Sequence, residues 1–330
     1  MSHSNLEQLA DRIILLVRSN PKKKFELKGL VKKFKAGASD INAALRISSG
    51  WGYKFFQKRD KISFVSAPDI LSSTEIGYKL KTKIIGRKIH SFNTVKSTNE
   101  IAGELADKGA VEGTIVTAEK QTLGKGRLGR SWHSPEKLGI YVSIILRPKF
   151  PPEKAPGLSI MSALAVAETL SDCGVKNVSI KWPNDVLINN KKTAGVLTEL
   201  SAEKNKINHV IVGIGINVKQ SETDFPSNIR ESATSIQSES KKTFARVELF
   251  QKLLRSFEKE YQLYRKSQLS KSLSRIRKIS AILNQDITLA RSGNTITGRV
   301  VDIDSAGSLV VESNGVRKTV SSGEVTVVKK

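Results

Sequence analysis

The 330-residue sequence has few of the residues that build disulfides, metal centres and membrane spans. Its one cysteine, Cys173, excludes an internal disulfide and is typical of a reducing cytoplasm. Its four histidines show no metal-ligand spacing, and no apolar run approaches the roughly 20 residues of a membrane span. The N-terminus lacks a basic region followed by an apolar stretch, so we expect no secretory signal. These absences predict a cytoplasmic protein without a protein-held metal or a membrane contact.

Acidic residues are scarce relative to basic ones. The sequence has 55 Lys and Arg against 31 Asp and Glu, a net charge of +24. Residues 1–66 hold 14 basic and 5 acidic residues, whereas residues 284–330 hold 6 and 5. A basic N-terminal segment favours a polyanionic partner such as DNA, although a generally basic proteome would give the same sign.

The N-terminal 66 residues predict three short helices followed by a β-hairpin, the order of a winged helix-turn-helix. These elements are expected over 5–19, 27–34, 40–47, 53–57 and 62–65. Residues 67–86 are predicted to link this module to the next and to hold one short helix. A putatively DNA-binding domain would thus end at residue 66.

Residues 87–278 predict a larger domain in which strands and helices do not strictly alternate, which indicates an α+β fold with a mixed sheet. Ser97 and Glu100 are spaced as a capping box ahead of a helix over 101–108. The remaining strands are expected over 88–95, 113–118, 139–147, 178–181, 186–188, 193–200 and 209–218, with helices over 158–172 and 243–266. Residues 279–330 then offer five short strands separated by turn signals, which predicts a small barrel.

Residues 124–132 read GKGRLGRSW and place three glycines and three cations in one short loop. The loop nearly matches G-x-G-x-x-G and the P-loop, but both patterns need a helix directly afterwards, and Trp132-His133-Ser134-Pro135 follows here. Neither pattern therefore applies. Glycine and cation density still favours an anion site, and a mobile basic surface turn is the alternative.

Two further segments carry unusual residues. In KWPND, Lys181 ends a strand at a proline turn, where a cation can enter a pocket beside the sheet or remain at the surface. In VIVGIGINV, Gly213 and Gly215 interrupt an apolar strand. Glycines there indicate a close backbone approach or a β-bulge.

Together, GKGRLGRSWHSP, KWPNDVLINNKKTAGVLTEL and VIVGIGINV resemble the signature blocks of the biotin protein ligases. The order and spacing of the blocks match over roughly 87–270. The terminal modules make the chain similar to the bifunctional class that is both ligase and biotin-operon repressor. The resemblance implies a class II synthetase-like catalytic domain over 87–278 and an SH3-like barrel over 279–330.

The resemblance also implies the chemistry. Family members activate biotin with ATP to give biotinyl-5′-AMP and pyrophosphate, and then transfer biotin to a lysine of a biotin carboxyl carrier domain. Fixed cations suit this reaction because the carboxylate and the triphosphate repel each other. Mg²⁺ would arrive with ATP, held mainly by its phosphates. No nucleophilic side chain is required. A homodimer is expected from the class alone.

Site residues follow by matching family positions. Arg127 and Lys181 would act on the reacting carboxylate and phosphate. The biotin-binding residues would be Ser97, Thr98, Asn99, Gln121, Lys125, Gly126, Arg127 and Lys181, and those for ATP or the adenylate would be Arg130, Trp132 and Asn217. Lys125 replaces the first arginine of the family form GRGR, which keeps the charge and loses the two-pronged donor.

The DNA role has weaker support in the sequence. The candidate recognition helix carries Asn42 and the cation Arg46, and Lys58 and Arg59 lie in the hairpin turn. A degenerate winged helix kept for stability is the alternative. Two other functions stay open: a DNA-binding sensor of biotinyl-AMP, and a lipoate or octanoate ligase.

Overall fold

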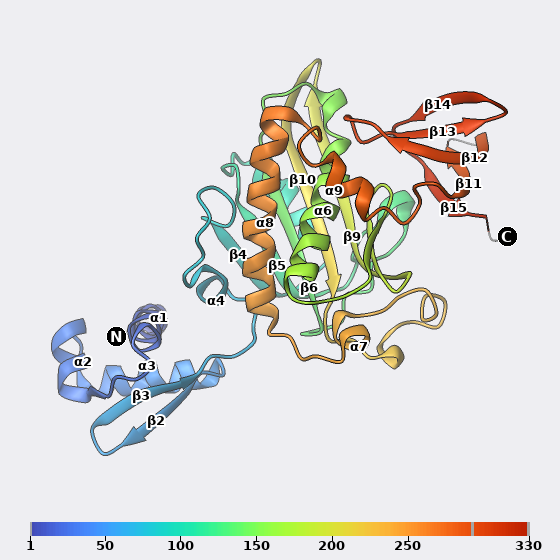
Figure 1. Ribbon diagram of the computed structural model, residues 1–330. Coiled ribbons are helices and arrows are strands. Elements are labelled where there is room, and N and C mark those ends of the chain that lie inside the picture. The colour runs from blue at the N-terminus through green and yellow to red at the C-terminus, as the bar shows by residue number, and fades with distance from the viewer. Residues whose placement is uncertain (1, 292–293, 329–330) are drawn as a thin grey trace. The chain divides into compact units, whose positions relative to one another are not determined.

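The computed structural model describes residues 2–291 and 294–328. The chain forms two compact units, Met1–Ile70 and Leu71–Lys330. Figure 1 shows the elements of both units. No helix in the described part is long and apolar enough to cross a membrane.

The first unit packs three helices against a three-stranded antiparallel sheet in the order β1-β3-β2. Its elements are α1 (His3–Ser19), β1 (Phe25–Glu26), α2 (Leu27–Phe34), α3 (Ala38–Gly50), β2 (Lys54–Lys58) and β3 (Lys61–Ser66). Lys35 takes a left-handed conformation that ends α2, and Gly37 caps α3, so a short turn separates the two helices. The predicted helices and hairpin are confirmed, and β1 is an addition.

The segment predicted as a linker is only partly free of the second unit. From Leu71 onward its apolar side chains lie in the core of that unit, as do Ile76 of α4 (Ser73–Gly77) and Ile85. The buried carboxylate of Glu258 accepts hydrogen bonds from the backbone N–H groups of residues 83, 84 and 85, at 2.6–3.0 Å. The expected linker over 67–86 is therefore largely part of the second unit.

The second unit is built on a seven-stranded mixed sheet in the order β4-β5-β6-β10-β9-β8-β7. Only β4 and β5 are parallel, and the other neighbours are antiparallel. The strands are β4 (Ile89–Val95), β5 (Ile115–Gln121), β6 (Gly139–Leu146), β7 (Val178–Lys181), β8 (Asp185–Ile188), β9 (Lys191–Glu203) and β10 (Lys206–Asn217). The predicted mixed sheet is confirmed.

Helices cover both faces of this sheet. The apolar helix α6 (Gly157–Asp172) and the amphipathic helix α8 (Arg246–Ser267) lie side by side on one face (Figure 1). Helix α5 (Thr98–Asp107) packs on the other face, where Ala102 and Ala106 meet Ile211 of β10. Because strand side chains alternate, residues 213, 215 and 217 share the α5 face with Ile211.

The C-terminal strands form a five-stranded antiparallel sheet in the order β14-β13-β12-β11-β15. They are β11 (Asp286–Arg291), β12 (Asn294–Ile303), β13 (Leu309–Ser313), β14 (Val316–Val320) and β15 (Glu324–Val327). All five predicted strands are present. No ladder joins β14 to β15 within the described residues, so the strands form a sheet with two edges.

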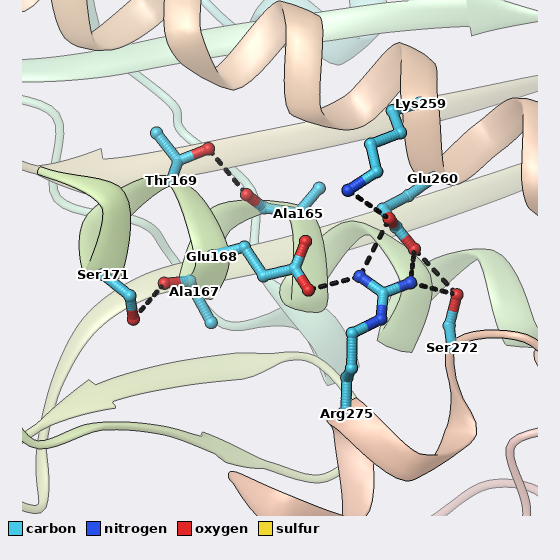
Figure 2. A network of polar contacts seen from close by, with 9 residues as sticks. All are labelled: Ala165, Ala167, Glu168, Thr169, Ser171, Lys259, Glu260, Ser272 and Arg275. Carbon is cyan, nitrogen blue, oxygen red and sulfur yellow. Dashed lines mark hydrogen bonds and ion pairs between the residues drawn. The ribbon is translucent and has the colours of Figure 1, made fainter.

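A polar network fastens the segment that leads into this sheet. Figure 2 shows Arg275 of α9 (Leu273–Lys278) between Glu168 of α6 and Glu260 of α8. Arg275 donates two hydrogen bonds to the fully buried Glu260 carboxylate at 2.8 and 3.0 Å, and Ser272 donates a third at 2.7 Å. Helix α9 was not predicted, and neither was α7 (Ile236–Ser240). The network ties the C-terminal sheet to the catalytic sheet through α9.

Candidate functional site

A cavity of about 430 Å³ opens on the α5 face of the large sheet. Its walls come from the start of α5, the loop 124–132, the β7–β8 turn, β9, β10 and the turn before β15. All of the predicted ligand-binding residues line it: Ser97, Thr98, Asn99, Gln121, Lys125, Gly126, Arg127, Arg130, Trp132, Lys181 and Asn217. Residues from four separate segments of the sequence thus meet in one place.

The glycines of β10 make room for two of these side chains. A Cβ atom on Gly213 would lie 2.2 Å from Asn99 Oδ1, and one on Gly215 would lie 2.4 Å from Trp132 Nε1. Gly195 is opposite Gly215 on β9 and also faces the Trp132 ring. The irregular register of β10 lies elsewhere, between Ile207 and His209. A close approach, and not a bulge, therefore explains the glycines.

A chain of hydrogen bonds fixes the end of the cavity next to α5. Gln121 Oε1 accepts from the Thr98 backbone N–H at 2.8 Å and from Thr98 Oγ1 at 3.0 Å. Ser143 Oγ lies 2.8 Å from Thr98 Oγ1 and 2.6 Å from Asn99 Oδ1, and the Asn99 amide donates to Glu199 at 2.6 Å. These side chains are held rigidly, which suits recognition of a small polar group.

The predicted capping box at the start of α5 is wrong. Ser97 occupies the N-cap position, but its side chain makes no capping hydrogen bond. Glu100 instead pairs with Lys125 of the glycine-rich loop, with 2.7 Å between Lys125 Nζ and Glu100 Oε1. This hydrogen bond to Glu100 raises the pKa of Lys125 above its ordinary value. The pair connects the loop to α5.

The loop 124–132 folds back on itself. Gly126 N donates to Arg130 O at 2.7 Å, and Trp132 N donates to Gly124 O at 2.8 Å. Leu128 at the tip has a φ of 56° and is 72% exposed. No helix follows the loop, because the chain continues through 133–138 into β6. The rejection of the two helix-dependent phosphate patterns is therefore confirmed.

Arg127 and Lys181 point their charges into the cavity from different sides. Arg127 donates to Asn184 Oδ1 at 2.9 Å and to Gly323 O at 3.2 Å. Burial lowers the pKa of Arg127, and the nearby carboxylate of Asp185 opposes this. The Lys181 amine makes no hydrogen bond or ion pair among the described residues. A charge without a partner beside a hydrogen-bonded guanidinium can bind an anion.

Trp132 and Asn217 define the other end of the cavity. The Trp132 indole Nε1 is buried and has no hydrogen-bond partner in the described chain. The Asn217 amide donates to Thr234 O at 3.0 Å, and Gln220 donates to Asn217 Oδ1 at 3.2 Å. An aromatic ring beside oriented amides suits a flat heteroaromatic ligand.

Several lining residues were not predicted. Asn184 and Asp185 lie in the KWPND block, and Lys192 lies in the block after it, so the sequence placed them near the site without giving them roles. Glu324 pairs with Arg130 from the turn before β15. No motif marks Glu324, because the contact depends on how the C-terminal sheet packs.

The residues predicted to contact DNA lie on the first unit. Asn42 and Arg46 are four positions apart on α3, so they share one face, and Arg46 is exposed. Lys58 ends β2, and Arg59 follows it in the turn, where its φ is 53°. All four thus occupy α3 and the hairpin.

The described residues include no group of three or more His, Cys, Asp or Glu side chains that could hold a metal ion. The cavity is instead lined by cations, amides and one indole. This arrangement can hold an anionic ligand together with an aromatic one. It offers binding and charge stabilisation, and the sequence expectation of a reaction without a protein nucleophile is consistent with it.

Comparisons with known proteins agree with this chemistry. A model of the Biotin/lipoate A/B protein ligase family matches residues 91–217, and a model of the Biotin protein ligase C terminal domain matches residues 282–328. The Bacillus subtilis bifunctional ligase/repressor BirA is 37% identical over 266 residues, which cover 80% of this chain and 82% of that protein. The Escherichia coli protein of the same name is 28% identical, covering 87% and 88%.

A solved structure extends the match to three dimensions. The biotin protein ligase of Aquifex aeolicus, in complex with biotin and ATP, has a TM-score of 0.64 and 30% identity. The match covers 74% of this chain and all of that one. With the sequence relatives, these matches span both the large sheet and the C-terminal sheet. The chain belongs to the biotin protein ligase family.

Proposed function

We propose that this protein is an ATP-dependent biotin protein ligase that makes biotinyl-5′-AMP and transfers biotin to a lysine of a biotin carboxyl carrier domain. The observation that carries the proposal is the single cavity lined by a rigid polar end, a group of cations and a tryptophan–amide end. Biotin has a polar ureido ring and a carboxylate, and ATP has phosphates and a base. The order of the three parts supports one ligand of that composition.

The polar end next to α5 suits the ureido ring. Thr98 and Asn99 are oriented by Gln121 and Ser143, so their hydrogen-bonding atoms are preorganised. A site built to hydrogen-bond a ureido group would reject lipoate and octanoate, because its buried polar atoms would lose their partners. We assign Ser97, Lys125 and Gly126 to the same end.

The cations suit the reaction centre. The biotin carboxylate attacks the α-phosphorus of ATP, and pyrophosphate leaves. Arg127 and Lys181 would bring the two anions together and stabilise the charge that builds on the α-phosphate. The carrier lysine then attacks the mixed anhydride, and AMP leaves. The protein supplies positioning and charge, and the two nucleophiles come from the substrates.

The tryptophan–amide end suits the nucleotide. Trp132 would lie against the adenylate and Asn217 would face the adenine, while Arg130 would leave Glu324 to meet a phosphate oxygen. Mg²⁺ would enter as part of the ATP substrate, bound mainly by the phosphates. The exposed tip of loop 124–132 would close over the adenylate and keep water away from it.

The terminal regions support a second role. We propose that residues 1–66 form a winged helix-turn-helix that binds operator DNA, with α3 as the recognition helix and the β2–β3 hairpin as the wing. Asn42 and Arg46 would reach bases or phosphates, and Lys58 and Arg59 would contact the backbone. The names of the BirA relatives support a repressor role. We assign a catalytic domain to 87–278, an SH3-like domain to 279–330, and a homodimer to the repressor.

A trapping experiment tests the ligase proposal. Wild-type protein is incubated with biotin and MgATP, and bound and released biotinyl-AMP are separated by rapid filtration. We expect wild type to retain the adenylate until a carrier domain is added, and Arg127→Gly to release it. Replacing the acceptor lysine of the carrier with arginine should abolish transfer but not adenylate formation. Retention of the adenylate by Arg127→Gly would contradict the role of that residue.

A further inference from the structure

Lys192 is a cation inside the cavity to which the sequence gave no role. It lies at the start of β9, with its Nζ atom 2.7 Å from Asp185 Oδ1 and 5.4 Å from the centroid of the Trp132 ring. Its side chain is 36% exposed. The ammonium group is therefore held within the cavity by a carboxylate and an aromatic face.

The backbone beneath Lys192 is shaped for this position. A Cβ atom on Gly195 would lie 3.3 Å from Lys192 Cε, 3.5 Å from Lys192 Nζ and 3.0 Å from Trp132 Cζ3. The lysine and the indole thus lie side by side across a bare stretch of β9. The preceding residue, Lys191, is exposed and does not line the cavity, since neighbouring strand residues face opposite sides.

The other cations of the cavity leave a gap in the charge that ATP requires. Lys125 is paired with Glu100 on α5, and Arg130 is paired with Glu324. Under the proposed function, Arg127 and Lys181 serve the biotin carboxylate and the α-phosphate. The β- and γ-phosphates carry most of the triphosphate charge, and they become the leaving pyrophosphate.

We infer that Lys192 is a further substrate-binding residue, which holds the β- and γ-phosphates of ATP and then the pyrophosphate that leaves. Asp185 is the positioning residue that holds the ammonium group in the cavity when ATP is absent. Lys192 takes part in no covalent step. It balances the negative charge that passes to pyrophosphate when the bond between the α-phosphorus and the bridging oxygen breaks. The inference rests on the proposed ligase function.

Lys191 provides a matched control for the test. Lys192→Gln and Lys191→Gln remove the same charge from adjacent positions of β9, one inside the cavity and one outside. ATP–pyrophosphate exchange with biotin is measured for both, and binding of ATP and of AMP is measured by calorimetry. For Lys192→Gln we expect the KM for ATP and for pyrophosphate to rise about 10- to 100-fold, as expected for a lost charge-assisted hydrogen bond. The KM for biotin and the affinity for AMP should stay within about twofold of wild type, and Lys192→Arg should recover part of the loss.

The outcomes separate the inference from the function. Matching kinetics and ATP affinity for the two glutamine variants would overturn the role of Lys192 while the ligase function stands. Equal loss of AMP and ATP binding in Lys192→Gln would also overturn it, because the contact would then be with the base, the ribose or the α-phosphate. Absence of both biotin-dependent exchange and ATP binding in wild type would overturn the proposed function and the inference together. Thermal melting of each variant confirms that it is folded.

Discussion

Gly215→Ala tests the arrangement of the cavity without removing a polar group. The added Cβ would lie 2.4 Å from Trp132 Nε1 and 2.5 Å from Cε2, about 1 Å closer than the 3.4 Å at which ordinary contact begins. The indole must therefore move by about 1 Å, and such a displacement can cost about 100-fold in rate. Because Trp132 lies at the nucleotide end, we expect the KM for ATP to rise and the KM for biotin to stay near wild type.

Gly213→Ala is the matched variant on the same face of β10. Its Cβ would lie 2.2 Å from Asn99 Oδ1, at the end of the cavity assigned to the ureido ring. We expect this variant to raise the KM for biotin and to leave the KM for ATP nearly unchanged. Overpacking in either variant costs about 1–3 kcal/mol, so both should remain folded in a thermal melt. Loss of affinity for the same substrate in both variants would refute the assignment of the two ends.

Three other predictions follow from single contacts. Glu100→Gln removes the partner of Lys125, so dissociation of the adenylate should speed up about two- to fivefold at low salt and depend less on salt than in wild type, which a filter assay would measure. Glu119→Gln weakens the buried ion pair with Arg246, whose atoms are 2.6 Å apart, and denaturant unfolding should show a loss of about 3 kcal/mol; a loss below about 0.5 kcal/mol would contradict this. Burial lowers the pKa of His209 below its ordinary 6.5, so the folded state favours neutral imidazole and loses stability as the pH falls below 6.5. His209→Gln should lose less stability than wild type between about pH 7.5 and pH 5.5, and equal losses in thermal melts would rule this out.

The sequence predicted most elements because their apolar periodicity is long enough to read. Helix α2 and strands β7 and β14 have the predicted bounds. The elements that were missed are short: β1 has two residues, α7 has five and α9 has six. So few residues show no period, and these elements are stabilised by partners that are distant in the sequence.

The linker and the capping box show why local patterns fail. Residues 83–85 have no regular apolar spacing, and they are fixed by Glu258, about 170 positions later. The spacing of Ser97 and Glu100 fits a capping box, but Lys125 is close enough in the fold to take the Glu100 carboxylate. In each case a tertiary contact replaces the local interaction that the pattern suggested.

The candidate site was predictable where several segments agreed and unpredictable where packing decides. GKGRLGRSW, KWPND and GIGIN together indicated the residues that line the cavity. The contacts of Arg127 with Gly323 O and of Arg130 with Glu324 depend on the orientation of the C-terminal sheet. The pairing of Lys192 with Asp185 depends on the register of β8 against β9. No motif in one segment contains that information.

ATP–pyrophosphate exchange with purified protein is the most direct test of the central claim. Exchange is measured with biotin, lipoate, octanoate or no acid. The account predicts exchange only with biotin, because the hydrogen-bonded end of the cavity selects the ureido ring and the cations then serve any carboxylate that it positions. Exchange with lipoate or octanoate but not with biotin, or no exchange with any acid, would contradict the account.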